Sequence, residues 1–323
     1  MTQKKPKISL LIWTYNRAHL VERAIQSVLK QTYQDFELVL VNNGSQDNTR
    51  QVLEKYQGHE KIRIFHLEKN RGDLGGMNFS LDQIGGEWFA TLGDDDEILE
   101  NTFELLMKLP TEIDPEINAV TCNSINTSTG KFSGFGLDRD QYLPVEVIVG
   151  KVRGEFFGIT KTELLGNKRI REDLPGEENV FWHQIDAIAK RYYIHKGLKI
   201  WHTDHGGTES ARIGAADIGL KTNIYRLLLE EQFYWNLLRK YNIRQYAARC
   251  LRGLVFLSIA REKEGAEAYK QLLKQVDVNL KIRLLSKITV SLPPRILHAF
   301  YLFFGNNRLF YNFLFRKYSR ISR

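Results

Sequence analysis

The stretch that decides the fold is residues 8–43, ISLLIWTYNRAHLVERAIQSVLKQTYQDFELVLVNN, in which two short apolar runs flank an amphipathic segment. The runs at 8–13 and 36–41 have the length and apolar content of buried strands. Between them, apolar residues recur at helical spacing: Leu20, Val21, Ala24, Ile25, Val28 and Leu29. This order of elements predicts parallel strands joined by a crossover helix.

The same alternation continues to residue 92. Further strands are predicted at 62–67 and 88–92, and Ser45 is expected to cap a helix that runs through Tyr56. Ligand sites of such sheets lie beyond the carboxyl ends of the strands. A polar cluster follows each predicted strand: TYNR (14–17), NNGS (42–45), EKNRGD (68–73) and GDDDE (93–97). We therefore expect the four loops to share one rim.

The rest of the chain divides into a β-rich and a helical part. The runs NAVTCNS, KFSGFG, VEVIVG and GEFFGIT, within residues 118–160, predict added strands on the far side of a cleft. An acidic turn leading into a helix follows in REDLPGEENVFWHQIDAIAKR (171–191). From about residue 215, helical spacing continues until Pro293 and Pro294. We expect an α/β domain at 1–214 and a helical region at 215–323.

Composition narrows the class of protein. With 323 residues, 43% of them hydrophobic, the chain can bury a sizeable core. Cys122 and Cys250 stand far apart without C-x-x-C spacing, which argues against a disulfide framework or zinc site and fits a reducing cytosol. The apolar run at 8–13 is too short for a signal peptide. The net charge of +8 resides in residues 280–323, which hold nine Lys or Arg and no Asp or Glu.

Four acidic residues are adjacent in TLGDDDEIL (91–99). Neighbouring carboxylates repel one another and resist desolvation, so some interaction must offset this cost. An isolated DDD is most often a solvated turn. Here it directly follows an apolar run and shares the predicted rim. Carboxylates in such a place can hold Mg²⁺ or Mn²⁺ together with substrate phosphates.

At this point the sequence resembles the inverting family-two glycosyltransferases of the GT-A fold. The resemblance covers about residues 7–212 and rests on an ordered set: residues 8–49, then NRGDLGGMNFSL, GEWFATLGDDDEIL and PGEENVFWHQI. It implies a Rossmann-like, mostly parallel sheet with flanking helices. It also implies transfer of a sugar from a nucleotide-diphospho-sugar, helped by Mg²⁺ or Mn²⁺, to a glycan or lipid-linked acceptor in cell-surface polysaccharide synthesis.

The resemblance assigns roles to residues of all four loops. Thr14, Tyr15 and Arg17 would shape the nucleoside pocket, Asn43 would face the base, Arg71 would lie near the nucleotide, Asp94 and Asp95 would hold ribose and metal, and Asp96 would support or replace Asp95. The register within GDDD is open by one residue. Taken singly, Arg17 and Arg71 are better explained as surface charges, and Asn43 as a turn residue before Gly44, but the joint match of the motifs reverses this preference.

Two positions depart from the family pattern. Asn42 and Asn43 stand where two aspartates are usual, and Met77 replaces an expected arginine. An Asn side chain can still accept a hydrogen bond from a base N–H, and it can also donate one. The resemblance favours uracil, with thymine or guanine open.

A general base is expected in PGEENVFW, because inversion needs a carboxylate to deprotonate the acceptor hydroxyl. The resemblance places Glu178 on the base position and keeps Glu177 in reserve. Both could instead stabilise the first turn of a helix. WHTDHGGTESAR resembles a loop that closes over the pyrophosphate. It nominates His205 as a metal ligand and, less firmly, Arg212, with His202 as the competing histidine.

The C-terminal tail, residues 293–323, is apolar, aromatic and basic. Residues 296–315 have the length of a membrane span, but Arg308 at its middle would cost ~2.5 to 3.5 kcal/mol. Two short amphipathic helices lying on an anionic membrane surface are the favoured hypothesis. Docking of the tail on the protein remains an alternative. RNA binding is disfavoured because no nucleic-acid motif accompanies the tail.

The sequence thus predicts a glycosyltransferase at the cytoplasmic face of the cell membrane. A sugar-phosphate nucleotidyltransferase is an alternative, although the glycine-rich, arginine-containing loop of such enzymes is absent after residue 13. A non-catalytic nucleotide-sugar-binding or scaffold protein is another. No G-x-G-x-x-G follows the first strand and no G-x-x-x-x-G-K-[ST] occurs, which disfavours dinucleotide enzymes and P-loop proteins.

Overall fold

The computed structural model describes residues 7–203, 218–278 and 280–304. They form two compact units. The first comprises Met1–Glu172 and Phe181–Gly207, and the second Asp173–Val180 and Thr208–Arg323. The domain boundary after residue 214 stays a prediction. The structure adds that residues 173–180 group with the C-terminal helices.

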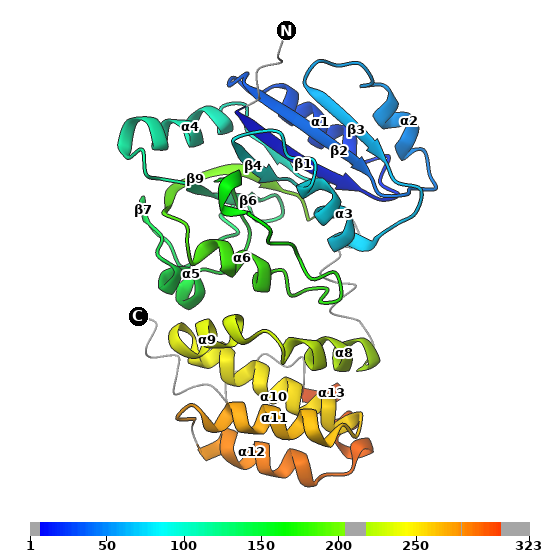
Figure 1. Ribbon diagram of the computed structural model, residues 1–323, viewed down its shortest axis with the longest axis vertical. Helices are drawn as coiled ribbons and strands as arrows, with labels where there is room; N and C mark the ends of the chain where they lie inside the picture. Colours follow the sequence, from blue (N-terminus) through cyan, green and yellow to red (C-terminus); the bar gives the residue numbers. More distant parts are fainter. Residues whose placement is uncertain (1–6, 204–217, 279, 305–323) are drawn as a thin grey trace. The chain divides into compact units, whose positions relative to one another are not determined.

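The first unit begins as the sequence predicts (Figure 1). Its early elements are β1 (Ile8–Thr14), α1 (Val21–Leu29), β2 (Phe36–Asn42), α2 (Thr49–Glu54), β3 (Ile62–His66), α3 (Gly72–Leu81) and β4 (Trp88–Thr91). β1 lies parallel to both β2 and β4, and β2 lies parallel to β3. The predicted strands and the first helix are confirmed. Ser45 was a wrong choice for the cap, because α2 begins at Thr49 after Asn48.

The second half of the sheet is mixed rather than parallel. It contains β5 (Glu97–Ile98), β6 (Ala119–Asn126), β7 (Gln141–Tyr142), β8 (Phe156–Lys161) and β9 (Arg191–Trp201). The strand order is β3-β2-β1-β4-β8-β6-β9-β5, and β7 pairs with β9. β8 is antiparallel to β4 and β6, whereas β6 is parallel to β9.

Two predicted strands in this half are wrong. KFSGFG (131–136) forms no strand, only isolated bridges of Phe132 to Ile125 and of Phe135 to Arg153. VEVIVG forms the helix α5 (Val145–Lys151), although Val and Ile favour strands. Pro144 precedes its first turn, where a missing N–H costs nothing. Val149 is buried, and Val147 and Ile148 pack against a cluster that includes Leu143 and Tyr193. Tertiary packing therefore overrides the local preference.

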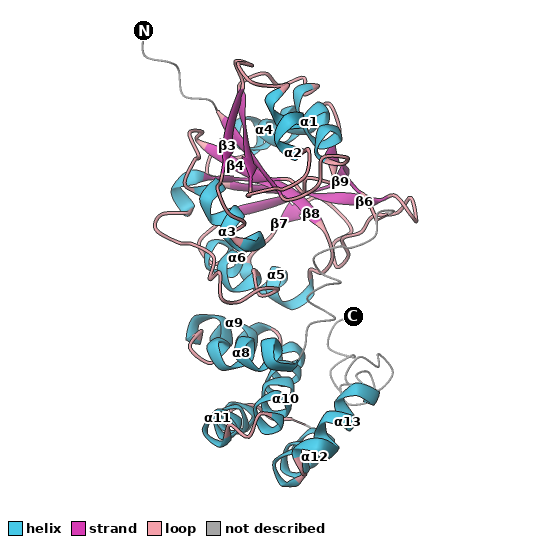
Figure 2. Cartoon of the chain, turned by 90° about the vertical axis from the view of Figure 1, so that its right-hand side faces the viewer, coloured by secondary structure: helices cyan, strands magenta, loops and turns pink. Residues whose placement is uncertain are grey.

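Helices cover both faces of the sheet (Figure 2). On one face, α1 and α4 (Thr102–Lys108) pack on a core of apolar strand residues, and a single π-helical turn (Leu109–Ile113) follows α4. On the other face, α3 and α6 (Asn179–Asp186) pack on Leu11, Val39 and Phe89. A short 3₁₀ turn (Thr162–Leu164) follows β8. The unit is an α/β fold whose first four strands present their carboxyl ends at one edge.

The second unit is helical, as predicted. Its helices are α8 (Ile218–Leu228), α9 (Gln232–Tyr241), α10 (Ile243–Ile259), α11 (Lys263–Lys274), α12 (Leu280–Ser291) and α13 (Pro294–Phe304). α10 contacts each of the other five. Rings of Trp235, Tyr246 and Tyr269 meet edge to face in its core. Within the described ranges, no helix has the length and apolarity needed to cross a membrane.

Candidate functional site

The carboxyl edge of β1–β4 brings the four polar loops together. Hydrogen bonds join them directly: the Asn43 N–H donates to the Thr14 carbonyl at 2.9 Å, and the Leu67 N–H donates to the Asn42 carbonyl at 2.9 Å. The Asn16 N–H donates to Ser45 Oγ at 3.0 Å. The shared rim that the sequence predicts is therefore a real structural feature of this unit.

The turn after β2 is packed too closely for a side chain. Gly44 has φ +74°, and a Cβ there would lie 2.4 Å from the Asn70 backbone nitrogen. Only glycine adopts this conformation without cost and also admits the neighbouring backbone. The loop after β3 is thus held against the loop after β2.

Arg17 lies between two of the acids. Its Nη1 donates to Asp94 Oδ1 at 3.0 Å and to Asp95 Oδ2 at 2.6 Å. Burial raises the pKa of Asp94 to about 6, although Arg17 and the Thr14 hydroxyl both act to lower it. The Asp95 side chain is 18% exposed and that of Asp94 is 10% exposed. Asp95 is therefore the more accessible of these two carboxylates.

Asp96 pairs with Lys199 rather than with Arg17. Lys199 Nζ lies 2.8 Å from Asp96 Oδ2, and the His202 N–H donates to Asp96 Oδ1 at 3.0 Å. Burial raises the pKa of Asp96, while Lys199 opposes the rise. Burial lowers the pKa of Lys199, but Asp96 and Glu155 outweigh this and leave it above its usual value. Both oxygens of Asp96 are thus engaged by the chain itself.

The structure shows how adjacent aspartates coexist. Their repulsion is offset by Arg17 and Lys199, and the Arg23 guanidinium donates to the Asp95 carbonyl. Sequence reasoning missed Lys199. A lone lysine between Leu198 and Ile200, within an apolar run, was the available signal that it is buried and needs an anionic partner.

The donor set fits a hard divalent cation in part. Mg²⁺ and Mn²⁺ take carboxylate oxygens and can be held by one or two carboxylates with substrate phosphates. Asp95 offers such an oxygen, whereas the contacts of Asp96 favour a place behind it. In the parts of the chain described here, no three His, Cys, Asp or Glu side chains are grouped so as to hold a metal ion by themselves. Any ion at this edge would need further ligands from substrate or water.

The side chain of Asn43 holds the loop after β2 to the loop after β3 by hydrogen bonds. Its Oδ1 accepts from the Arg71 N–H at 3.0 Å, and its Nδ2 donates to the Gly72 carbonyl at 2.8 Å and to Asn70 Oδ1 at 3.2 Å. Asn42 makes the Asx turn, since its Oδ1 accepts from the Ser45 N–H at 2.9 Å. A direct contact between Asn43 and a base would use its remaining acceptor capacity.

The other predicted nucleotide residues are spread over the rim. Thr14 is buried beside Asp94, and Tyr15 is half-buried. Arg71 is exposed and reaches Glu172 at 3.4 Å. Met77 is buried on α3 in the core and therefore makes no polar contribution to the rim.

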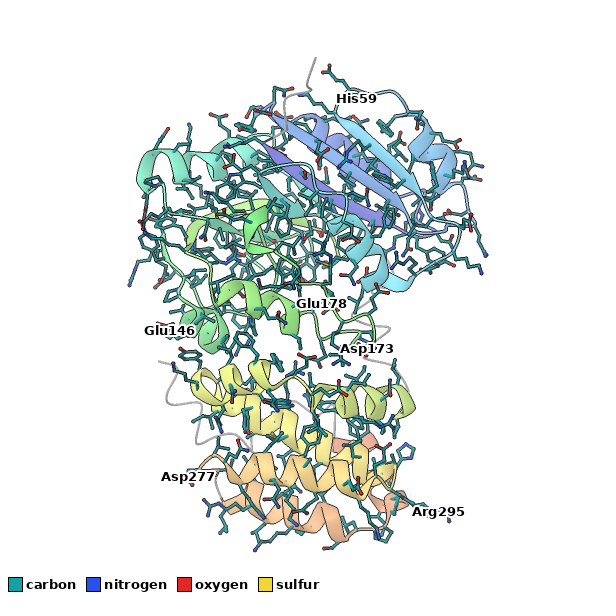
Figure 3. All side chains as sticks on the ribbon, viewed as in Figure 1. His59, Glu146, Asp173, Glu178, Asp277 and Arg295 are labelled. Carbon is teal, nitrogen blue, oxygen red and sulfur yellow. The ribbon has the colours of Figure 1, made fainter. Side chains whose placement is uncertain are left out.

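The two candidate bases belong to the second unit and differ in their contacts. Glu177 forms an ion pair with Arg249 on α10, with Nη1 at 2.6 Å from Oε1 and 2.5 Å from Oε2. Glu178 precedes α6 and accepts from the Gly176 N–H at 3.0 Å (Figure 3). The pairing of Glu177 with a buried arginine favours a structural role for it and leaves Glu178 as the better base candidate.

Of the histidines considered, His202 is described. Its Nε2 lies 2.7 Å from Glu97 Oε1, directly beyond the aspartate cluster. His205 and Arg212 lie outside the described residues.

Comparison with known sequences identifies the domain. Residues 9–153 match the family model described as glycosyl transferase family 2. The chain is 29% identical over 302 residues to a GalNAc(5)-diNAcBac-PP-undecaprenol beta-1,3-glucosyltransferase of Campylobacter jejuni, covering 90% of this chain and 94% of that protein. It is 22% identical to the glycosyltransferase GlyG of Streptococcus pneumoniae over 62% of this chain and 71% of that one.

Solved structures agree on the fold. TarS of S. aureus, residues 1–349 in complex with UDP-GlcNAc, superposes with a TM-score of 0.62 at 17% identity, over 83% of this chain and 90% of that one. The mannosyltransferase PcManGT of Pyrobaculum calidifontis, in complex with GDP-Man and Mn²⁺, gives 0.52 at 15% identity, over 94% and 89%. The chain is a glycosyltransferase of the GT-A fold, and its residues 9–153 match glycosyl transferase family 2.

Proposed function

We propose that the protein is an inverting, metal-dependent glycosyltransferase that moves a sugar from a nucleotide-diphospho-sugar to a lipid-linked glycan. The observation that carries this proposal is the aspartate cluster at the carboxyl edge of β1–β4, with Arg17 bound to Asp94 and Asp95. The Campylobacter relative, named for an undecaprenol-linked acceptor, matches along nearly its whole length and supports the acceptor class.

The donor would bind along the rim. Thr14, Tyr15 and Arg17 would shape the nucleoside pocket, Asn43 and Arg71 would lie near the nucleotide, and Asp94 would bind the ribose. Asp95 would hold Mg²⁺ or Mn²⁺, with Asp96 behind it and His205 as a further ligand. A bound ion would supply positive charge against the leaving diphosphate. Uracil is the favoured base, from the resemblance of the motifs.

Glu178 would be the general base. Its carboxylate would take the proton of the acceptor hydroxyl as that oxygen forms a bond to the anomeric carbon. The bond from that carbon to the diphosphate would break on the opposite face, and the nucleoside diphosphate would leave with the electron pair. Arg17 would orient the carboxylates of Asp94 and Asp95, and its charge would favour the ionised form of Asp94.

Ligand-induced stabilisation would test the donor site. A ligand that binds only the folded protein raises its unfolding temperature. We expect UDP with Mn²⁺ to raise the midpoint of thermal unfolding of wild type, and Asp95→Asn to lose this shift. GDP and dTDP, each with Mn²⁺, complete the set of probes. If none of these nucleoside diphosphates raised the unfolding midpoint of the wild-type protein, the donor assignment would be contradicted.

Substitution of the proposed base would test the chemistry. Glu178→Gln should lower transfer by at least ~10² fold, the scale of general base catalysis, because the amide cannot accept the acceptor proton. Its thermal shift with UDP and Mn²⁺ should equal that of wild type. Glu163→Gln, at an exposed position of the first unit, is the matched control and should retain full transfer. Full transfer by Glu178→Gln would reassign the base.

The place of action is the cytoplasmic face of the cell membrane, reached through residues 293–323. Of this tail the structure describes residues up to Phe304 in α13, and residues 305–323 lie outside the described part. The lysines and arginines of the tail, with no acidic residue among them, support attraction to anionic lipid.

A further inference from the structure

α12 turns three of its large apolar residues outward. Leu280, Leu284 and Ile288 follow one another at helical spacing, so they form a stripe along one face. They are 70%, 49% and 49% exposed. Ile296 at the start of α13 is also exposed to about half. We call Leu280, Leu284, Ile288 and Ile296 the outer stripe.

The opposite face of α12 packs inward and combines apolar with small polar residues. Ser286 and Thr289 are buried there together with Ile282. Their hydroxyls donate to carbonyls of the same helix: Ser286 Oγ to Arg283 and Thr289 Oγ1 to Leu285, both at 2.8 Å. Because these bonds satisfy the hydroxyls, the helix can bury its small polar residues and leave leucine and isoleucine outside. The apolar residues of α12 are therefore divided between its inner and outer faces, unlike those of the usual amphipathic helix.

Cations flank the outer stripe. Arg283, Lys287 and Arg295 are exposed, and Arg295 points away from the helices (Figure 3). Arg283 meets Asp277 at 2.7 Å, and no acidic residue occurs after Asp277 in the sequence. An exposed apolar stripe bordered by arginine and lysine has the chemistry of a helix that lies in a membrane interface.

Charge also argues against two other groups that could cover the outer stripe, namely residues 305–323 and a second copy of the chain. Residues 305–323 hold five Lys or Arg and no acid, so covering the stripe with them would bring like charges together. A second copy, docked about a two-fold axis, would oppose the same cations to themselves. An anionic lipid surface complements both the apolar stripe and its border.

We propose that the outer stripe of α12 and α13, with Arg283, Lys287 and Arg295, is the surface by which the protein lies on an anionic membrane, with Leu280, Leu284 and Ile288 inserted among the lipids. This deepens the membrane part of the proposed function, and it is independent of the donor and base assignments. It extends the contact from the basic tail to α12, which precedes the tail in the chain.

Vesicle flotation with the full chain tests the proposal. Vesicles of phosphatidylcholine with phosphatidylglycerol should carry the protein upward, and vesicles of phosphatidylcholine alone should not. Added salt should reduce the bound fraction because it screens the cations. Leu284→Gln combined with Ile288→Gln should reduce binding at least about tenfold, because two large apolar side chains lose their burial in lipid.

Controls separate this surface from the tail and from misfolding. Phe233→Gln removes an exposed aromatic residue of α9 and should float like wild type. Glutamine supports helices, so the double variant should keep the unfolding temperature of wild type. Lys287→Glu leaves the stripe intact and should weaken flotation on the anionic vesicles without lowering the unfolding temperature.

Two results would overturn the proposal. The first is undiminished flotation of the double variant, above all if deletion of residues 305–323 abolishes it. The second is a wild-type dimer, seen by light scattering, that the double variant converts to monomer while flotation stays unchanged. Because neither readout uses sugar transfer, loss of transfer with normal flotation would count against the proposed chemistry alone.

Discussion

At the scale of single residues, neighbouring glutamates have different environments. Glu177 and Arg249 are both nearly buried, and Arg249 also lies over the Tyr234 ring at 5.4 Å. Burial lowers the pKa of Arg249, but Tyr234 and Glu177 outweigh this and raise it. The guanidinium therefore stays charged, and its loss would leave a carboxylate buried without its partner.

Arg249→Met should accordingly lower the free energy of unfolding by about 3 kcal/mol, as expected for breaking a buried ion pair. Urea denaturation followed by circular dichroism would measure the change. Arg226→Met is the control, because Arg226 and Glu262 form an exposed pair on the same unit, and it should cost under ~0.5 kcal/mol. Equal effects of the two substitutions would show that Glu177 does not depend on Arg249.

Single residues of the site were predictable only where a local motif marks them. Arg17 and the aspartates stand in short polar runs directly after apolar strands, so their shared edge follows from the strand order. No local motif indicates Lys199, because its ion pair with Asp96 depends on the pairing of β5 with β9. The engagement of Asn43 by Arg71 and Gly72 likewise depends on how two loops fold against each other.

At the scale of elements, the turn between β2 and α2 shows what fixes the rim. Gly44 and Gly58 share a positive φ, +74° and +84°, but a Cβ at Gly58 would meet nothing within 4 Å. Gly58→Ala should therefore cost only the backbone strain, about 1 kcal/mol. Gly44→Ala should cost about 3 kcal/mol or more, because the loop of Asn70 must also move. Thermal unfolding of both variants would measure these losses of stability. Equal losses would mean that the loop of Asn70 moves aside at no cost in free energy.

Elements were predictable where sequence period and packing agree. The buried runs of β1–β4 and the apolar face of α1 each satisfy one pattern, and both were found. α5 shows the opposite case, because its Val and Ile residues favour a strand while Pro144 and the cluster around Leu143 select a helix. β9 was missed, since it is recognised chiefly by pairing with β6, β5 and β7.

At the scale of the whole molecule, the division of the chain could not be predicted from the sequence. Residues 173–180 lie between segments of the first unit in the chain but group with the helices of the second. Proline and glycine mark the turn at 175–176, yet they carry no information about its partner. The ion pair of Glu177 with Arg249 spans 72 residues, and such pairing emerges only when α10 is in place.

If residues 173–180 are stabilised by the second unit, their local opening should follow the stability of that unit. Tyr269→Ala removes a fully buried ring whose hydroxyl donates to the Tyr225 carbonyl at 2.6 Å, and it should cost about 3 to 5 kcal/mol. Amide hydrogen exchange of 173–180 and of α10 should then accelerate together, while β1 and β2 keep their protection. Phe103→Ala, in the core of the first unit at 5.6 Å from the Phe36 ring, is the reciprocal control and should expose β1 and β2 instead. Exchange of 173–180 that responds to Phe103→Ala and ignores Tyr269→Ala would assign this segment to the first unit and remove the structural role given to Arg249.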